Sequence, residues 1–183
     1  MLDLHAIDKS WTLFLDRDGV INREKEDGYI LHYDEFVFYE GVKEALPILA
    51  AKFGRILIVT NQRGIGKGLM TLRDLGDIHD NMLKEMEEAG GRIDRIYYCD
   101  SMSDEHPLRK PNPGMAFEAK MNYPEIDLHH SVMVGNTMSD MEFGRNAGMH
   151  TVYLRTTRPD QPLPHPFIDL SFNSLQDFAR ALG

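Results

Sequence analysis

The chain has 183 residues, of which 42% are apolar and 27% are charged, and its formal net charge at pH 7 is −9. This length suits one folded domain with its own core, so we expect a single domain over residues 1–183. The acidic balance argues against a nucleic-acid partner, because binding a polyanion normally requires a basic face. No apolar run approaches a membrane span and the first residues lack the pattern of a secretory signal, so we expect a cytoplasmic protein with no membrane partner.

Cys99 is the only cysteine of the chain. It cannot form an internal disulfide or a multi-cysteine zinc site, which agrees with a reducing compartment. A single cysteine most often packs as a small apolar residue.

Short apolar runs alternate with amphipathic segments along the whole sequence. The runs that predict strands are residues 12–16, 55–60, 93–99, 131–135 and 150–155. The segments that predict helices are residues 41–53, the stretch from Thr71 to the Gly90-Gly91 pair, residues 114–121 and residues 139–146. After a proline-rich stretch, residues 167–172 and 174–182 predict a last strand and helix. This order predicts an α/β fold, a doubly wound parallel sheet with helices on both faces and right-handed crossovers.

The helix after Thr71 has the clearest pattern, with Thr71 as its N-cap. Its apolar stripe, which predicts core packing, consists of Leu72, Leu75, His79, Met82 and Met86. Pro47 weakens the prediction of the helix over residues 41–53, because proline removes a backbone hydrogen bond from a helix interior.

A long connection, residues 22–40, separates the first predicted strand from the first predicted helix. Loops of this length are usually functional or disordered. Tyr29, Tyr33, Phe36 and Phe38 favour a folded flap beside the strand ends, with a short strand over residues 36–39.

Polar residues follow the predicted strands at the edge of the sheet where ligands bind in doubly wound folds. Asp16 and Asp18 end the first strand, and two such carboxylates suit a hard cation and an in-line displacement on phosphorus. Asp16 would be the nucleophile and Asp18 the acid/base. Such an attack requires masking of the phosphoryl charge, a task for magnesium and for Lys110, while Thr60 and Asn61 would form a phosphate cradle.

Each feature also has a simpler explanation. The Asp16 to Gly19 segment could begin a calcium loop, but Val20 and Ile21 occupy positions that would need oxygen ligands. The glycines over residues 64–68 resemble a nucleotide loop, yet they fail both the phosphate-loop and the dinucleotide patterns, and we expect a turn there. Lys110 alone is most often a solvated lysine and Asn61 alone a turn residue. Their joint placement, with Asn61 at a strand end and Lys110 in a turn ahead of a helix, favours the catalytic interpretation.

As a set, these residues resemble the haloacid dehalogenase (HAD) superfamily, and the resemblance covers nearly the whole chain. The four superfamily motifs match, in order, Asp16-Arg17-Asp18, Thr60-Asn61, Lys110 and Gly135-Asn136-Thr137-Met138-Ser139-Asp140. Residues 16–22, 27–29, 60–65 and 109–111 resemble the branch of D,D-heptose 1,7-bisphosphate phosphatases and histidinol-phosphatases.

The resemblance implies a capless phosphomonoesterase that forms an aspartyl-phosphate. Magnesium would be held by Asp16, the Asp18 carbonyl and the fourth motif, which contains Asn136 and Asp140. Thr60 and Lys110 would steady the phosphoryl group. The residues that would meet the rest of the substrate are Arg17, Asp27, Gly28, Tyr29, Gln62, Arg63 and Arg109.

Two departures from the family pattern bear on function. Asn136 stands where the family usually has Asp, so a charged metal ligand becomes a neutral one. The zinc loop of the branch is short here, with only Cys99 and His106, which falls short of the four ligands of a structural zinc site. We therefore expect magnesium and no zinc.

The favoured function is hydrolysis of a heptose bisphosphate by a monomeric enzyme, with histidinol phosphate or another small phosphomonoester as the alternative substrate. A different class is a phospho-ligand binding protein that lost turnover, motivated by Asn136. A polynucleotide 3′-phosphatase is a third hypothesis, which the acidic balance disfavours.

Metal analysis of the purified protein tests the zinc prediction. We expect zinc well below one equivalent per chain, because too few soft ligands are present. One equivalent of tightly held zinc would show the prediction to be wrong.

Overall fold

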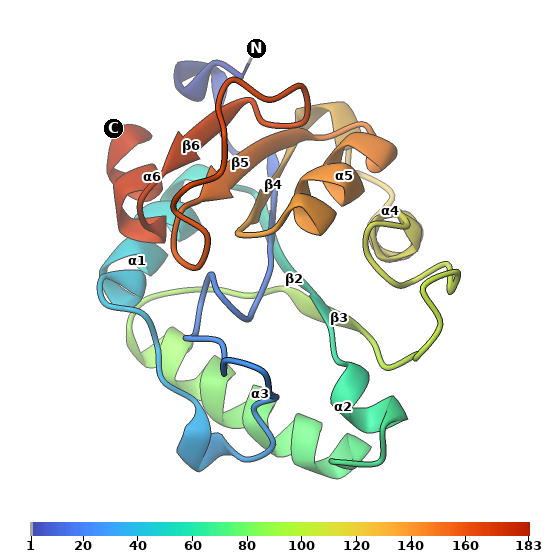
Figure 1. Ribbon diagram of the computed structural model, residues 1–183. Helices are drawn as coiled ribbons and strands as arrows, with labels where there is room; N and C mark the ends of the chain where they lie inside the picture. The colour runs from blue at the N-terminus through green and yellow to red at the C-terminus, as the bar shows by residue number, and fades with distance from the viewer. Residues whose placement is uncertain (1) are drawn as a thin grey trace.

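The protein is described by a computed structural model, which covers residues 2–183. It contains one six-stranded sheet in the order β3-β2-β1-β4-β5-β6 (Figure 1). The strands are β1 (Thr12–Leu15), β2 (Arg55–Asn61), β3 (Arg95–Cys99), β4 (Ser131–Gly135), β5 (His150–Leu154) and β6 (Leu170–Phe172). Every pairing is parallel. The expected doubly wound α/β sheet is therefore confirmed. Strands β2 and β3 are added on one side of β1 and strands β4 to β6 on the other, so the switch point of the strand order lies between β1 and β4.

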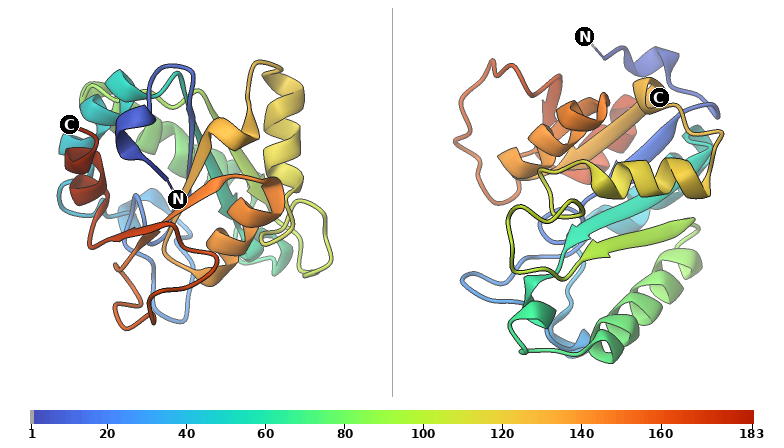
Figure 2. Two further views of the ribbon diagram at one scale, coloured as in Figure 1. Left: turned by 90° about the horizontal axis from the view of Figure 1, so that it is seen from above. Right: turned by 90° about the vertical axis from the view of Figure 1, so that its right-hand side faces the viewer.

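Helices cover both faces of this sheet. They are α1 (Val42–Lys52), α2 (Arg63–Gly66), α3 (Leu72–Glu88), α4 (Gly114–Asn122), α5 (Met138–Ala147) and α6 (Leu175–Ala181). Short 3₁₀ helices add Leu4–Ala6, Tyr33–Glu35 and Leu128–His130. Figure 2 shows α1 and α6 on one side of the sheet and α4 on the other. Within residues 2–183, no helix has the length and apolarity required to span a membrane.

The alternation of side chains along the central strand divides the core into two layers. Leu13 and Leu15 of β1 pack with α1, α3 and α6, whereas Phe14 packs with α4 and α5. All three side chains are fully buried. A buried central strand fixes the position of the residues that follow it, and Asp16 is the first of these.

Local sequence signals explain the ends and continuity of two helices. The Thr71 hydroxyl accepts a hydrogen bond from the Asp74 amide at 3.1 Å, and the Asp74 carboxylate accepts one from the Thr71 amide at 2.7 Å, which forms a capping box at the start of α3. Helix α1 continues through Pro47. Burial of Leu46 and Leu49, each worth roughly 1.5–3 kcal/mol, offsets a proline cost of about 3 kcal/mol.

One local prediction, the short strand over residues 36–39, is wrong. Residues 36–39 form no strand, because the segment meets its neighbours only at the isolated Asn22–Phe38 bridge and has no continuous partner. Instead, aromatic rings organise this segment: Phe36 stacks on Tyr33 and meets Phe38 edge-on. The glycines over residues 64–68 form the single turn of helix α2 and the turn that follows it, in which the Gly68 amide donates to the Ile65 carbonyl at 2.8 Å, so the expected turn is present.

Candidate active site

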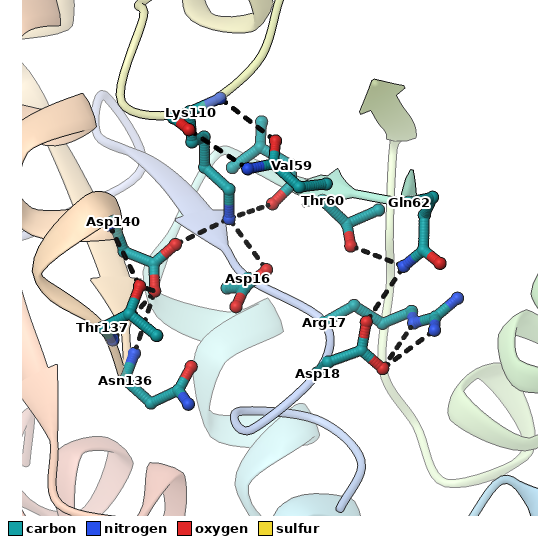
Figure 3. Close-up of polar contacts among 11 residues, drawn as sticks. Asp16, Arg17, Asp18, Val59, Thr60, Gln62, Lys110, Asn136, Thr137 and Asp140 are labelled. Atoms are coloured by element: carbon teal, nitrogen blue, oxygen red, sulfur yellow. Dashed lines mark hydrogen bonds and ion pairs between the residues drawn. The ribbon is translucent and has the colours of Figure 1, made fainter. Parts of the chain in front are cut away.

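The site begins with a buried lysine shared by two carboxylates. Lys110 Nζ lies 2.8 Å from Asp16 Oδ1 and 2.6 Å from Asp140 Oδ1, and it also donates to the Val59 carbonyl at 2.9 Å (Figure 3). These contacts join the end of β1, the end of β2 and the first turn of α5. All three ionic side chains are nearly inaccessible to solvent.

The charges of this trio do not balance. Burial alone would lower the pKa of Lys110, but the Asp140 and Asp16 carboxylates outweigh it and raise that pKa above its usual value. Burial and the neighbouring Asp140 carboxylate raise the pKa of Asp16 to about 7, against the opposing effect of Lys110. Two carboxylates thus share one ammonium, so a second cation near Asp16 would stabilise the ionised nucleophile.

Asn61 fixes the turn that carries Lys110. Its Oδ1 accepts from the Lys110 amide at 3.0 Å, and its Nδ2 donates to the Lys110 carbonyl at 3.2 Å. Both ends of the Asn61 amide are therefore used in positioning Lys110. The Thr60 hydroxyl is also buried and accepts from Gln62 Nε2 at 2.9 Å. The proposed phosphate-binding role of Asn61 and Thr60 thus stays a prediction.

Asp140 has two structural tasks that occupy both of its oxygens. Oδ1 faces Lys110, whereas Oδ2 accepts from the Thr137 amide at 3.0 Å, the Thr137 hydroxyl at 2.8 Å and the Asn136 amide at 3.2 Å. The Thr137 contacts form the capping box of α5. The structure therefore places Asp140 as a partner of Lys110 and of the α5 N-terminus, and its predicted role as a metal ligand stays a prediction.

The oxygens near Asp16 Oδ2 fit a hard cation. The terminal amide atom of Asn136 that faces Asp16 lies 3.3 Å from Asp16 Oδ2 and 3.1 Å from the Asp18 carbonyl, while the other meets Thr157 Oγ1 at 2.8 Å. With nitrogen inward, Asn136 donates to both acceptors; with oxygen inward, three acceptors face one another. The second orientation requires a cation between the three oxygens. The inward amide atom lies 3.3 Å and 3.1 Å from the other two, close to the separation of about 3 Å between adjacent ligand oxygens of octahedral magnesium.

A glycine makes this approach possible. Gly19 has φ +87°, and a Cβ on it would lie 2.0 Å from Asn136 Nδ2. Only glycine allows the chain after Asp18 to turn at this distance from the amide.

Asp18 is held as a carboxylate. Its oxygens accept from Arg17 Nη2 at 2.8 Å, Asn22 Nδ2 at 2.9 Å and Gln62 Nε2 at 2.9 Å. Burial alone would raise the pKa of Asp18, but the Arg17 guanidinium and these hydrogen bonds lower it below the usual value.

Comparisons with known proteins agree with this geometry. The family model described as HAD-hydrolase-like matches residues 107–167. A D-glycero-alpha-D-manno-heptose-1,7-bisphosphate 7-phosphatase of Mycobacterium bovis is 34% identical over 174 residues, 94% of this chain and 92% of the relative. A protein of the same name from Burkholderia mallei is 38% identical over 154 residues, 80% of each chain. The chain belongs to the HAD superfamily of hydrolases.

Solved structures support the same assignment. The D,D-heptose 1,7-bisphosphate phosphatase from B. bronchiseptica, solved with magnesium and phosphate, aligns with a TM-score of 0.85 at 28% identity and covers 94% of this chain and 97% of its own. The predicted superfamily and fold class are confirmed. The expectation of a phosphoric monoester hydrolase is confirmed at the level of the family.

A hollow of about 440 Å³ opens above Asp16. Its lining consists of Asp16, Asp18, Glu24, Asn61, Asp104, Arg109, Lys110, Pro111, Thr137, Met138, Ser139, Asp140 and Arg158. An adjoining hollow of about 520 Å³ shares Glu24 and Arg158 and contains the predicted segment Asp27-Gly28-Tyr29. The predicted substrate residues Gln62 and Arg63 do not line the main hollow.

The arginines of the predicted substrate set differ in their placement. Arg17 is fully buried and pairs with Asp18 and His79, so it is absent from the lining of the main hollow. Arg109 lines the hollow, and its Nε lies 3.0 Å from Asp104 Oδ1. Arg63 pairs with the same carboxylate. Asp104 thus holds two guanidinium groups at the rim.

Three residues of the hollow escaped the sequence analysis, namely Glu24, Asp104 and Arg158. Arg158 follows the fifth strand, so the strand-end rule that identified Asp16 would also have marked this segment. Glu24 and Asp104 lie in charged loops, where the sequence holds no signal that separates a site residue from a solvated one.

Cys99 and His106, the residues considered for zinc, lie close together, with Sγ 3.6 Å from Nδ1. Burial raises the pKa of the Cys99 thiol, which disfavours the thiolate that zinc requires. The absence of zinc stays a prediction.

Replacing Gly19 by Ala tests the close approach to Asn136. Gly68→Ala is the matched control, because Gly68 also has a positive φ but has no atom within 4 Å of an added Cβ. Both changes should cost about 1–2 kcal/mol for the left-handed backbone, and Gly19→Ala should cost at least about 1 kcal/mol more from overlap. Denaturant unfolding measures the difference, and equal losses would contradict the account.

Proposed function

We propose that this chain is a magnesium-dependent phosphomonoesterase that forms an aspartyl-phosphate on Asp16. One observation carries the proposal: Asp16 lines the open hollow, Lys110 fixes its Oδ1, and its Oδ2 lies 3.3 Å from an Asn136 amide atom that also approaches the Asp18 carbonyl. A buried carboxylate with one oxygen anchored in this way presents a defined nucleophile to a bound phosphate.

In the proposed reaction, Asp16 attacks phosphorus and the bond from phosphorus to the substrate oxygen breaks. Asp18 is a carboxylate in the free protein, so the acid role requires that it take up a proton as the anionic substrate binds; it then gives that proton to the leaving oxygen. Asp18 then takes a proton from water as the water oxygen attacks the phosphorus of the aspartyl-phosphate, which releases phosphate and restores Asp16. Lys110 places a positive charge beside the nucleophile and the transferring group.

Magnesium fits the oxygen set formed by Asp16, the main-chain carbonyl of Asp18 and Asn136. When bound there, the ion supplies positive charge that screens the phosphoryl oxygens from the attacking carboxylate. No group of three or more His, Cys, Asp and Glu side chains in the described part of the chain could hold a metal. The proposed set depends instead on one carboxylate, one amide and one carbonyl, so we expect weaker binding than an additional carboxylate would give.

The proposed substrate is D-glycero-D-manno-heptose 1,7-bisphosphate, the compound in the names of the curated relatives. A second phosphate on the substrate suits the cationic side chains of Arg109 and Arg158, which line the hollow together with Asp16. Because Asp104 pairs with Arg109 in the free protein, an incoming phosphate group would compete with that carboxylate.

Phosphate release from a panel of sugar phosphates, aminoalcohol phosphates and nucleotides tests the proposal. Wild type with magnesium should hydrolyse the heptose bisphosphate best, and chelation of magnesium should abolish turnover. Asp16→Asn, which keeps the shape but removes the nucleophile, should lower kcat by at least about 10³-fold. Absence of release across the panel, or a mutant that equals wild type, would refute the enzymatic proposal.

Asn136→Asp tests the metal-binding role of this amide. A carboxylate at this position adds a charge next to Asp16 and should tighten magnesium binding by about tenfold, or about 1.4 kcal/mol. Calorimetric titration of magnesium into both proteins measures this directly. Unchanged affinity would show that Asn136 is not a ligand.

A further inference from the structure

His79 contacts the catalytic loop from the core side of α3. The residue is 7% exposed and lies on the same helix face as the buried residues Leu75, Ile78 and Met82. Its Nε2 lies 3.2 Å from Arg17 Nη1. The core-packing stripe expected from the sequence therefore contains one polar contact to the residue between Asp16 and Asp18.

The chemistry of the pair fixes the state of the imidazole. A guanidinium only donates hydrogen bonds, so His79 Nε2 must be unprotonated and accept, and the ring proton lies on Nδ1. Burial and the positive charge of Arg17 lower the pKa of His79 to about 3, which keeps the ring neutral across the physiological range.

The contact leaves Arg17 little freedom. Arg17 has no exposed surface, and its Cζ lies 6.0 Å from the centre of the Phe36 ring. Nη1 is directed to His79, whereas Nε and Nη2 donate to Asp18 Oδ1 at 3.3 Å and 2.8 Å. Arg17 is the only cationic partner of Asp18 among the ion pairs of residues 2–183.

We propose that His79 is a positioning residue for phosphoryl transfer, which accepts a hydrogen bond from Arg17 and thereby fixes the guanidinium that orients the Asp18 carboxylate. This inference rests on the proposed function of Asp18 as acid/base. Neither His79 nor Arg17 lines the main hollow. Arg17 lines only a smaller hollow that shares Asp18, Glu24 and Asn61 with the main one, so loss of the contact should lower kcat more than it raises KM.

Three substitutions of His79 separate positioning from packing. His79→Gln places an acceptor oxygen near the position of Nε2 and should keep kcat within about threefold, whereas His79→Asn is too short and His79→Leu has no acceptor. Both of the latter should lower kcat about tenfold or more, a part of the roughly 10²–10⁴ that acid/base catalysis contributes. The Gln and Asn variants decide the question if His79→Leu does not fold. Ile78→Val, a core change on the same helix face, should keep the wild-type kcat.

A double-mutant cycle with Arg17→Lys tests whether His79 acts on Asp18 through Arg17. Arg17→Lys should itself lower kcat, and adding His79→Asn should then lower it by less than about twofold, because the contact is already lost. Effects that multiply independently, or a kcat of His79→Asn equal to wild type, would overturn the positioning role.

Nitrogen-15 NMR of the histidine rings supplies a readout without substrate. The Nε2 of His79 should show the shift of an unprotonated acceptor, and this shift should change in Arg17→Lys but not in Ile78→Val. A proton on Nε2 would overturn the contact itself. An inactive wild-type protein would overturn the proposed function and this inference together, whereas an active wild type with unaffected His79 variants would overturn the positioning role alone.

Discussion

The ion pair between the Lys110 ammonium and the carboxylates of Asp16 and Asp140 is the interaction on which the site depends. It joins the end of β1, the turn before α4 and the first turn of α5, which are far apart in sequence, at distances of 2.8 Å and 2.6 Å and almost out of contact with water. Buried ions are costly unless they are paired. The Asn61 contacts to the Lys110 backbone and the capping box that holds Asp140 can be understood as the supports of this one ammonium.

The same interaction supports the proposed bound cation. One ammonium serves two carboxylates, and the pKa of Asp16 rises to about 7 through burial and Asp140. The free oxygen of Asp16 faces a carbonyl and the Asn136 amide, which contribute no charge of their own. A divalent cation completes this charge balance, and it would do so beside a hollow that contains Arg109 and Arg158. Nucleophile activation and phosphate binding thus have one electrostatic origin.

Much of this arrangement could be predicted from the sequence, because parallel strands bring their carboxyl ends to one edge of the sheet. That rule was enough to group Asp16, Asp18, Thr60 and Asn61, whereas Lys110 lies in a turn before a helix and was included for its positive charge. The rule could not assign partners within the group: Asp140 turned out to hold Lys110 and α5, and Arg17 turned inward to His79. Such choices depend on distances of a few ångströms between elements, which periodicity does not encode. The missing strand at residues 36–39 has a related cause, since strand formation needs a partner that lies elsewhere in the fold.

Covalent trapping on Asp16 tests the central claim most directly. The enzyme would be quenched in acid during turnover of heptose bisphosphate with magnesium, reduced with borohydride, and digested for mass spectrometry. An aspartyl-phosphate at Asp16 is reduced to homoserine, so the account predicts this conversion at Asp16 in wild type and its absence when substrate is omitted. Phosphate release with Asp16 unmodified, or conversion of a different carboxylate such as Asp18, would contradict the account.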